Sequence, residues 1–130
     1  DIRDRQDIER LVVTFYERAF EDVVLGHIFV DVAKMDLVEH LPHMCDFWET
    51  VLFKTATYGR NAFEVHQRIH AMEQLTPMHF QRWEDLWHKT LDQTFRGEKA
   101  NLAKLHASRM SGSIQRRLAS GHPANVIRIV

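Results

Sequence analysis

Apolar positions along the chain recur at steps of three and four residues, the spacing that gathers side chains on one face of an α-helix. The first stripe runs through Ile8, Leu11, Val12, Phe15, Tyr16 and Ala19. Asp4 or Asp7 is a suitable cap for the start of this helix, because an aspartate accepts from the free N–H groups of the first turn. The stretch 24–29 contains Gly26 and predicts a short turn followed by a second piece.

Asp36 followed by Glu39 resembles a capping box and predicts the start of the next long helix. Its apolar face also carries His40, and consists of Leu37, Leu41, Met44, Trp48, Val51 and Leu52. Pro42 lies near the first turns and removes one backbone donor. It therefore predicts either a bend or a helix that starts near Leu41.

Three further helices are predicted downstream. Asn61, with Glu64 three residues later, begins a short one that carries Val65, His66, Ile69 and His70. A cap residue followed by proline begins the next at Thr76-Pro77. Its stripe contains Phe80, Trp83, Trp87, Leu91 and Thr94, and Gly97 ends it. The last helix faces inward with Ala103, Ala107, Met110, Ile114 and Leu118.

The pattern therefore predicts one all-α domain over residues 1–120 and a C-terminal tail over 121–130. Ser120-Gly121 and Pro123 stop the last helix. The tail sequence NVIRIV alternates apolar and polar residues, but no other segment reads as a strand that could pair with it. We expect the tail to be loose or docked on a partner.

Composition narrows the functional classes. With 130 residues, 45% of them hydrophobic, the chain suits one globular domain with one core. A net charge of −1 provides no basic field for nucleic acid. No apolar run approaches the roughly 20 residues of a membrane span, and no signal-peptide pattern is present. The single cysteine, Cys45, excludes a disulfide within the chain and its acidic neighbour disfavours a reactive thiolate. A cytoplasmic protein is predicted.

Histidine is over-represented, with 9 residues, and this suggests metal, haem or pH-dependent chemistry. His66 and His70 have the i, i+4 spacing of zinc ligands on one helix face. Zinc proteases need a glutamate directly after the first histidine, however, and Gln67 stands there. A closed structural zinc site usually needs cysteines as well. Acid–base catalysis by paired carboxylates is less well supported, because most carboxylates fall on polar helix faces.

A haem site is the third interpretation of the histidines. A flat apolar cofactor needs aromatic, methionine and aliphatic side chains around it, one imidazole for iron and polar groups on the opposite side. Separate helices supply Tyr16, His40, His66 and Trp83. Each alone could be an ordinary core residue, so the interpretation depends on their combination.

That combination resembles the group III truncated haemoglobins, a family of bacterial globins. The resemblance covers residues from about 7 to about 118. It rests on Phe15-Tyr16, LGHIF at 25–29, Tyr58, His66 and HFQRW at 79–83, and most specifically on HLPHM at 40–44 followed by DFW at 46–48.

The resemblance implies a helical sandwich, two helices over two, around one haem b. His66 matches the proximal iron ligand, and His70 is its competitor one turn later. His40, Tyr16 and Trp83 match the residues that stabilise ligands on the distal side. Pocket-lining positions are matched by Phe29, Met44, Phe47, Trp48, Ile69 and Phe80. His43 stands where a basic side chain often meets a haem propionate, and His106 stands where an arginine is common.

The implied function is binding of dioxygen and other diatomic gases, among them nitric oxide and carbon monoxide, at a polar distal pocket. So polar a pocket suits oxygen, nitric oxide or peroxide chemistry at least as well as transport. The activity would be that of a nitric oxide dioxygenase or a peroxidase, with electrons from an external reductase. A monomer or weak homodimer is expected. A non-catalytic ligand-binding or sensing module, and a helical zinc protein using His66 and His70, are the alternatives.

Overall fold

A computed structural model describes residues 1–54 and 75–120 of the chain. Within these ranges the regular structure is entirely helical, as predicted. The elements are α1 (Arg5–Glu21), α2 (Val23–Gly26), the π-helix η1 (His27–Val32), α3 (Leu37–Phe53), α5 (Pro77–Thr94) and α6 (Glu98–Ser120). No helix in the described part of the chain is long and apolar enough to span a membrane. The predicted helix around His66 and the tail 121–130 lie outside the described residues.

The helix starts follow the capping residues. Asp4 rather than Asp7 caps α1, since its carboxylate accepts from the Asp7 backbone N–H at 3.0 Å. Asp36 accepts from the N–H groups of Val38 and Glu39 and begins α3 at Leu37. The alternative start near Leu41 is therefore wrong, and Pro42 lies inside the helix. Proline is tolerated there because the carbonyl it leaves without a helical partner belongs to Val38, which is 83% exposed and reachable by water.

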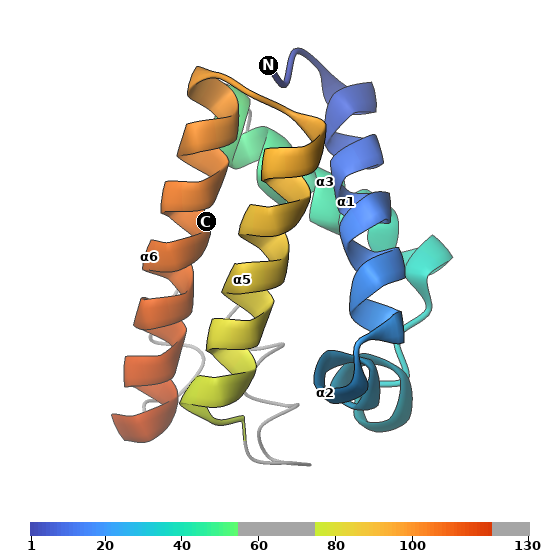
Figure 1. The fold of residues 1–130 in the computed structure, drawn as a ribbon, viewed down its shortest axis with the longest axis vertical. Coiled ribbons are helices and arrows are strands. Elements are labelled where there is room, and N and C mark those ends of the chain that lie inside the picture. The colour runs from blue at the N-terminus through green and yellow to red at the C-terminus, as the bar shows by residue number, and fades with distance from the viewer. Residues whose placement is uncertain (55–74, 121–130) are drawn as a thin grey trace.

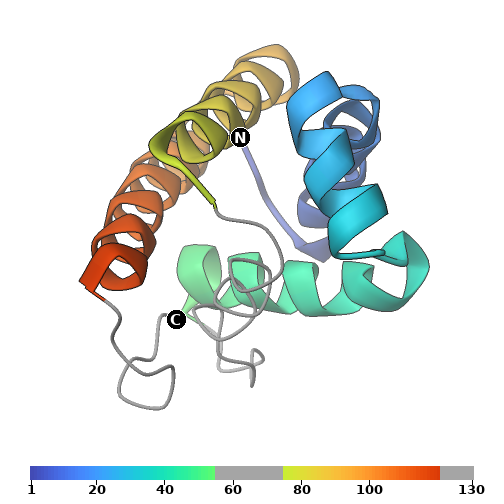
Figure 2. The ribbon, with the colours of Figure 1, turned by 90° about the horizontal axis from the view of Figure 1, so that it is seen from below.

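Among the described elements, the long helices α1, α3, α5 and α6 make up the body of the fold (Figure 1). Helix α1 packs against α3 and α5, and α6 packs against α5 and α3. Figure 1 shows α5 running antiparallel to its neighbours α1 and α6. In the view of Figure 2, α3 crosses one side of the assembly, away from α5. The buried apolar stripes of all four helices form one continuous core.

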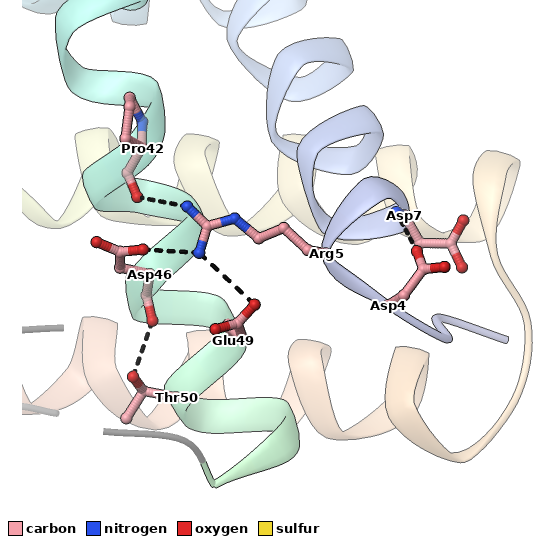
Figure 3. A network of polar contacts seen from close by, with 7 residues as sticks. All are labelled: Asp4, Arg5, Asp7, Pro42, Asp46, Glu49 and Thr50. Atoms are coloured by element: carbon pink, nitrogen blue, oxygen red, sulfur yellow. Dashed lines mark hydrogen bonds and ion pairs between the residues drawn. The ribbon is translucent and has the colours of Figure 1, made fainter. Parts of the chain in front are cut away.

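A polar network outside this core fixes α1 against α3 (Figure 3). The guanidinium of Arg5 donates to Asp46 at 2.7 Å and to the Pro42 carbonyl at 3.3 Å, and it lies 3.6 Å from Glu49. The Arg5 side chain is 39% exposed, so solvent screens these contacts and each contributes well under about 1 kcal/mol. Their main effect is to set the relative position of the two helices.

The segment between α1 and α3 is shaped by a close backbone approach. A Cβ at Gly26 would lie 2.5 Å from the Phe20 carbonyl oxygen, so only glycine lets α2 fold back on the end of α1. The chain then widens into η1, where the Ala33 N–H donates to the Ile28 carbonyl at 2.8 Å. The predicted turn and second piece are thus a short α-helix followed by a π-helix. Asp22 joins this segment to α5, since its carboxylate caps α2 and also accepts from Arg82 at 2.7 Å.

The first residue of the chain caps the last helix. The Asp1 carboxylate accepts from the backbone N–H groups of Lys99 and Ala100 at 2.9 and 3.0 Å, in the first turn of α6. Gly97 leads into that turn with a φ of 138°, a conformation that side chains disfavour. A Cβ there would also lie 2.7 Å from the Asp1 carboxyl carbon. The N-terminal residue is therefore linked to the start of α6 through a capping interaction.

We expect Asp1→Ala to lower the free energy of unfolding by about 1 kcal/mol, the usual cost of a lost N-cap. For a domain of this size, that loss corresponds to roughly 3–5 °C in the unfolding temperature. Thermal unfolding followed by far-ultraviolet circular dichroism measures it. Asp1→Asn is the matched control, because it keeps one acceptor oxygen and should lose less. Equal midpoints for wild type and Asp1→Ala would contradict the assigned role.

Candidate functional site

A cavity lies between η1, the first half of α5 and the second half of α6. Its volume is about 60 Å³. Most of its lining is apolar, and the lining residues are Leu25, Ile28, Phe29, Leu75, His79, Phe80, Trp83, Met110, Ser111 and Ile114. Its apolar lining with a few polar groups is typical of a pocket for an organic ligand, while its volume is well below that of a cofactor site.

Four aromatic residues that the sequence singled out lie at or beside this cavity. Phe29, Phe80 and Trp83 line it. Tyr16 packs edge-on against Phe29, with the ring centroids 5.5 Å apart. Phe15 lies between Tyr16 and Trp83, at 5.1 and 6.0 Å from the two rings. Side chains from α1, η1 and α5 thus converge on one region, although they are far apart in sequence.

The predicted site residues on α3 occupy a different part of the fold. Phe47 and Trp48 are buried, and Met44 packs against the core cluster. His40 and His43 are half-buried on the same helix. None of these five is among the described residues that line the cavity. Trp48 instead stacks on Trp87 of α5, with centroids 4.6 Å apart and an interplanar angle of 20°.

The remaining predicted site residues, His66 and Ile69, lie outside the described residues, as does the competing ligand His70. Among residues 1–54 and 75–120, no three His, Cys, Asp or Glu side chains gather in a way that could hold a metal ion. The zinc hypothesis at His66 and His70 thus concerns a segment that the described structure does not include.

Two polar residues of the cavity were missed by the sequence reasoning. Ser111 is 1% exposed and lines the cavity from α6. Its position four residues after the buried Ala107 was the signal that could have found it. His79 also lines the cavity, and its Nδ1 accepts from the Thr76 backbone N–H at 2.9 Å. Behind Ser111, burial raises the pKa of Glu84, although hydrogen bonds from Ser111 and Ser108 partly oppose this.

His106 has a buried ring nitrogen, Nε2, without a hydrogen-bond partner among the described residues. The ring meets Phe47 and Trp48 edge-on, at centroid distances of 5.9 and 6.0 Å. Burial lowers the pKa of His106, and the positive charge of Arg109 lowers it further. The neutral imidazole is therefore the form that this environment favours.

This shift has a consequence for stability at low pH. The His106 pKa is lower in the folded chain than its ordinary value of 6.5, so the unfolded chain takes up the proton first as the pH falls. The neutral His106 side chain therefore contributes fully to the free energy of unfolding above about pH 6.5. This contribution is lost as the pH falls below that value towards the lower pKa of the folded chain. We expect His106→Gln to flatten this part of the stability profile, measured by urea unfolding between pH 7.5 and about 5. His43→Gln is the matched control, and equal slopes for wild type and His106→Gln would contradict the prediction.

Comparison with known proteins identifies the fold. No family model and no curated protein sequence matches the chain. Among solved structures, the crystal structure of group III truncated hemoglobin from Campylobacter jejuni superposes with a TM-score of 0.79. The alignment covers 93% of this chain and 95% of that one, at 22% sequence identity. The predicted fold class is thereby confirmed: the chain has the all-α fold of a truncated globin.

Proposed function

We propose that this chain binds haem b in the cavity beside Trp83 and holds diatomic gases there. The observation that carries the proposal is the aromatic and aliphatic lining of that cavity within a truncated-globin fold. A flat apolar macrocycle needs such surroundings. The cavity of about 60 Å³ is smaller than the macrocycle, so neighbouring side chains would have to move when the cofactor binds. Haem, when bound, supplies an iron centre that takes up dioxygen, nitric oxide or carbon monoxide.

The protein's part in this function is to hold the cofactor and to set the polarity around its ligand. His66 is proposed as the iron ligand, with Ile69 beside it. Phe29 and Phe80 would contact the macrocycle, together with Met44, Phe47 and Trp48 of α3. His43 would reach a propionate. The apolar residues of α3 pack in the same core as Phe80 and would have to shift for the cavity to extend towards that helix.

The polar side of the pocket is assigned to three residues. The Tyr16 hydroxyl and the Trp83 indole N–H are donors, and both rings lie in the aromatic group around Phe15. A gas molecule with partial negative charge on its outer atom is stabilised by such donors, each net hydrogen bond contributing roughly 1 kcal/mol. His40, half-buried on α3, is proposed as a third donor or as a gate.

Such a pocket favours a chemical reaction of the bound gas over gas transport, because a protein that releases its ligand slowly is a poor carrier. Nitric oxide dioxygenation or peroxide reduction is the proposed activity, with an external reductase as the electron source. The alternative is a ligand-binding or sensing module without turnover. The two differ in whether nitric oxide, mixed with the reduced protein in dioxygen-saturated buffer, yields nitrate. A cytoplasmic monomer or weak homodimer remains a prediction.

We expect the purified protein to show an intense Soret absorption band that shifts when carbon monoxide is added to the reduced form. His66→Ala should abolish or alter the band, since the iron loses its protein ligand. His70→Ala, four residues later in the sequence, is the matched control and should leave the band in place. A protein that stays colourless after haem is added would exclude the proposal and make zinc at His66 and His70 the next hypothesis.

We expect Tyr16→Phe and Trp83→Phe each to raise the dioxygen dissociation rate by about fivefold, the equivalent of one net hydrogen bond of about 1 kcal/mol. The double variant should gain roughly tenfold to a hundredfold, depending on how strongly the two donors act together. Stopped-flow displacement of dioxygen by carbon monoxide measures these rates. Phe20→Leu, next to Tyr16, is the packing control. Rates equal to that control would show that neither residue donates to the ligand.

A further inference from the structure

The three tryptophans of the chain form one continuous stack. Trp83 and Trp87 are one turn apart on α5, and their rings are nearly parallel, at 3°, with centroids 6.0 Å apart. Trp48 of α3 lies on Trp87 at 4.6 Å and 20°. The stack begins at the cavity, which Trp83 lines, and ends at Trp48, which is 4% exposed. Ordinary aromatic packing favours edge-on or offset pairs but does not require all three indoles in one line.

Such a line of indoles is suited to passing an electron. Indole is among the most easily oxidised side chains, and near-parallel rings in contact overlap through their π systems. A positive charge on the central Trp87 would be attracted to the ring faces of both neighbours. The Trp87 N–H donates to the Ala103 carbonyl at 3.3 Å, which holds this ring in place between them.

An imidazole lies beside the far end of the stack. An oxidised indole is a much stronger acid than the neutral ring and readily loses its N–H proton. The His106 ring lies 6.0 Å from Trp48, and its Nε2 is the buried nitrogen without a partner. With its own proton on Nδ1, this imidazole has a free lone pair. The low pKa of His106 keeps it in the neutral form that can accept a proton.

We propose that Trp83, Trp87 and Trp48 form an electron-transfer chain that carries oxidising equivalents from the cavity to Trp48, where His106 takes up the proton. A one-electron oxidising radical in the cavity, such as nitrogen dioxide, gains one electron from Trp83 and leaves as its anion, nitrite. Trp87 then donates an electron to oxidised Trp83, and Trp48 donates an electron to oxidised Trp87. Trp48 then loses its N–H proton to Nε2 of His106, whose ring must first turn towards the indole because no hydrogen bond joins the two nitrogens. Trp48 remains as a neutral radical, so that charge and electrons balance. The proposal does not depend on haem.

The test uses azide radicals, made by pulse radiolysis of azide solution, on the full chain as purified. These radicals remove one electron from accessible indoles, and Trp83 is the only half-buried one of the three, since Trp48 and Trp87 are buried. Peptide mass spectrometry then locates the stable oxidation product. We expect it mainly on Trp48 in the wild type. In Trp87→Phe, which keeps an aromatic ring but breaks the chain, the product should move to Trp83 and its share on Trp48 should fall severalfold.

A wild-type product mainly on Trp83 or Tyr16, or an identical distribution in Trp87→Phe, would overturn the proposal. Near-ultraviolet circular dichroism establishes whether that variant is folded. If it is not, Trp83→Phe replaces it, and an unchanged product on Trp48 would then overturn the chain. His106→Leu tests the proton step, because cationic and neutral indole radicals absorb at different visible wavelengths. A longer-lived cation is expected, and an unchanged transient spectrum would remove His106 from the proposal.

Discussion

The contact on which the rest of the structure depends is the burial of Trp87 at the centre of the helices. Its ring lies 5.1 Å from Phe15 of α1 and 4.6 Å from Trp48 of α3, and its N–H binds a carbonyl of α6. One side chain of α5 thus touches all three other long helices. At 1% exposure its burial accounts for several kcal/mol of hydrophobic free energy, on the order of 25 cal/mol per Å² over 150–250 Å².

The cavity lies next to the most densely packed part of the core. In the second half of α5, the side chains of Trp87 and Leu91 are buried in the core. In the first half of α5, Phe80 and Trp83 line the cavity instead. The opposite wall comes from η1, which the close approach at Gly26 places against the end of α1. The well-packed core around Trp87 therefore holds the walls of the cavity in place, as a rigid scaffold usually does for a binding site.

The likeness to a solved truncated haemoglobin is strong in shape and weak in sequence, at a TM-score of 0.79 and 22% identity. Helical cores tolerate extensive exchange of apolar residues provided that volume and pattern are kept, which explains how the fold persists at this identity. The same tolerance does not extend to chemistry. The proposed haem ligand and distal donors therefore depend on particular residues such as His66, Tyr16 and Trp83.

Local signals in the sequence determined which residues form helices and which faces they bury. Asp36 and Thr76-Pro77 mark helix starts through contacts within one turn, and the stripes of α1, α5 and α6 are buried as their spacing predicts. These signals work because a cap or a stripe involves residues three or four positions apart. Motif resemblance added the globin fold and the aromatic group around the cavity.

Tertiary structure alone decided the contacts between residues distant in the chain. Asp1 caps a helix that begins 97 residues later in the sequence, and Trp48 stacks on Trp87. Ser111 completes the cavity wall, while His106 is left with an unpartnered nitrogen. Periodicity reports that a side chain points inward but not which helix it meets. That choice is made only when the helices pack against one another and every neighbour is fixed at once.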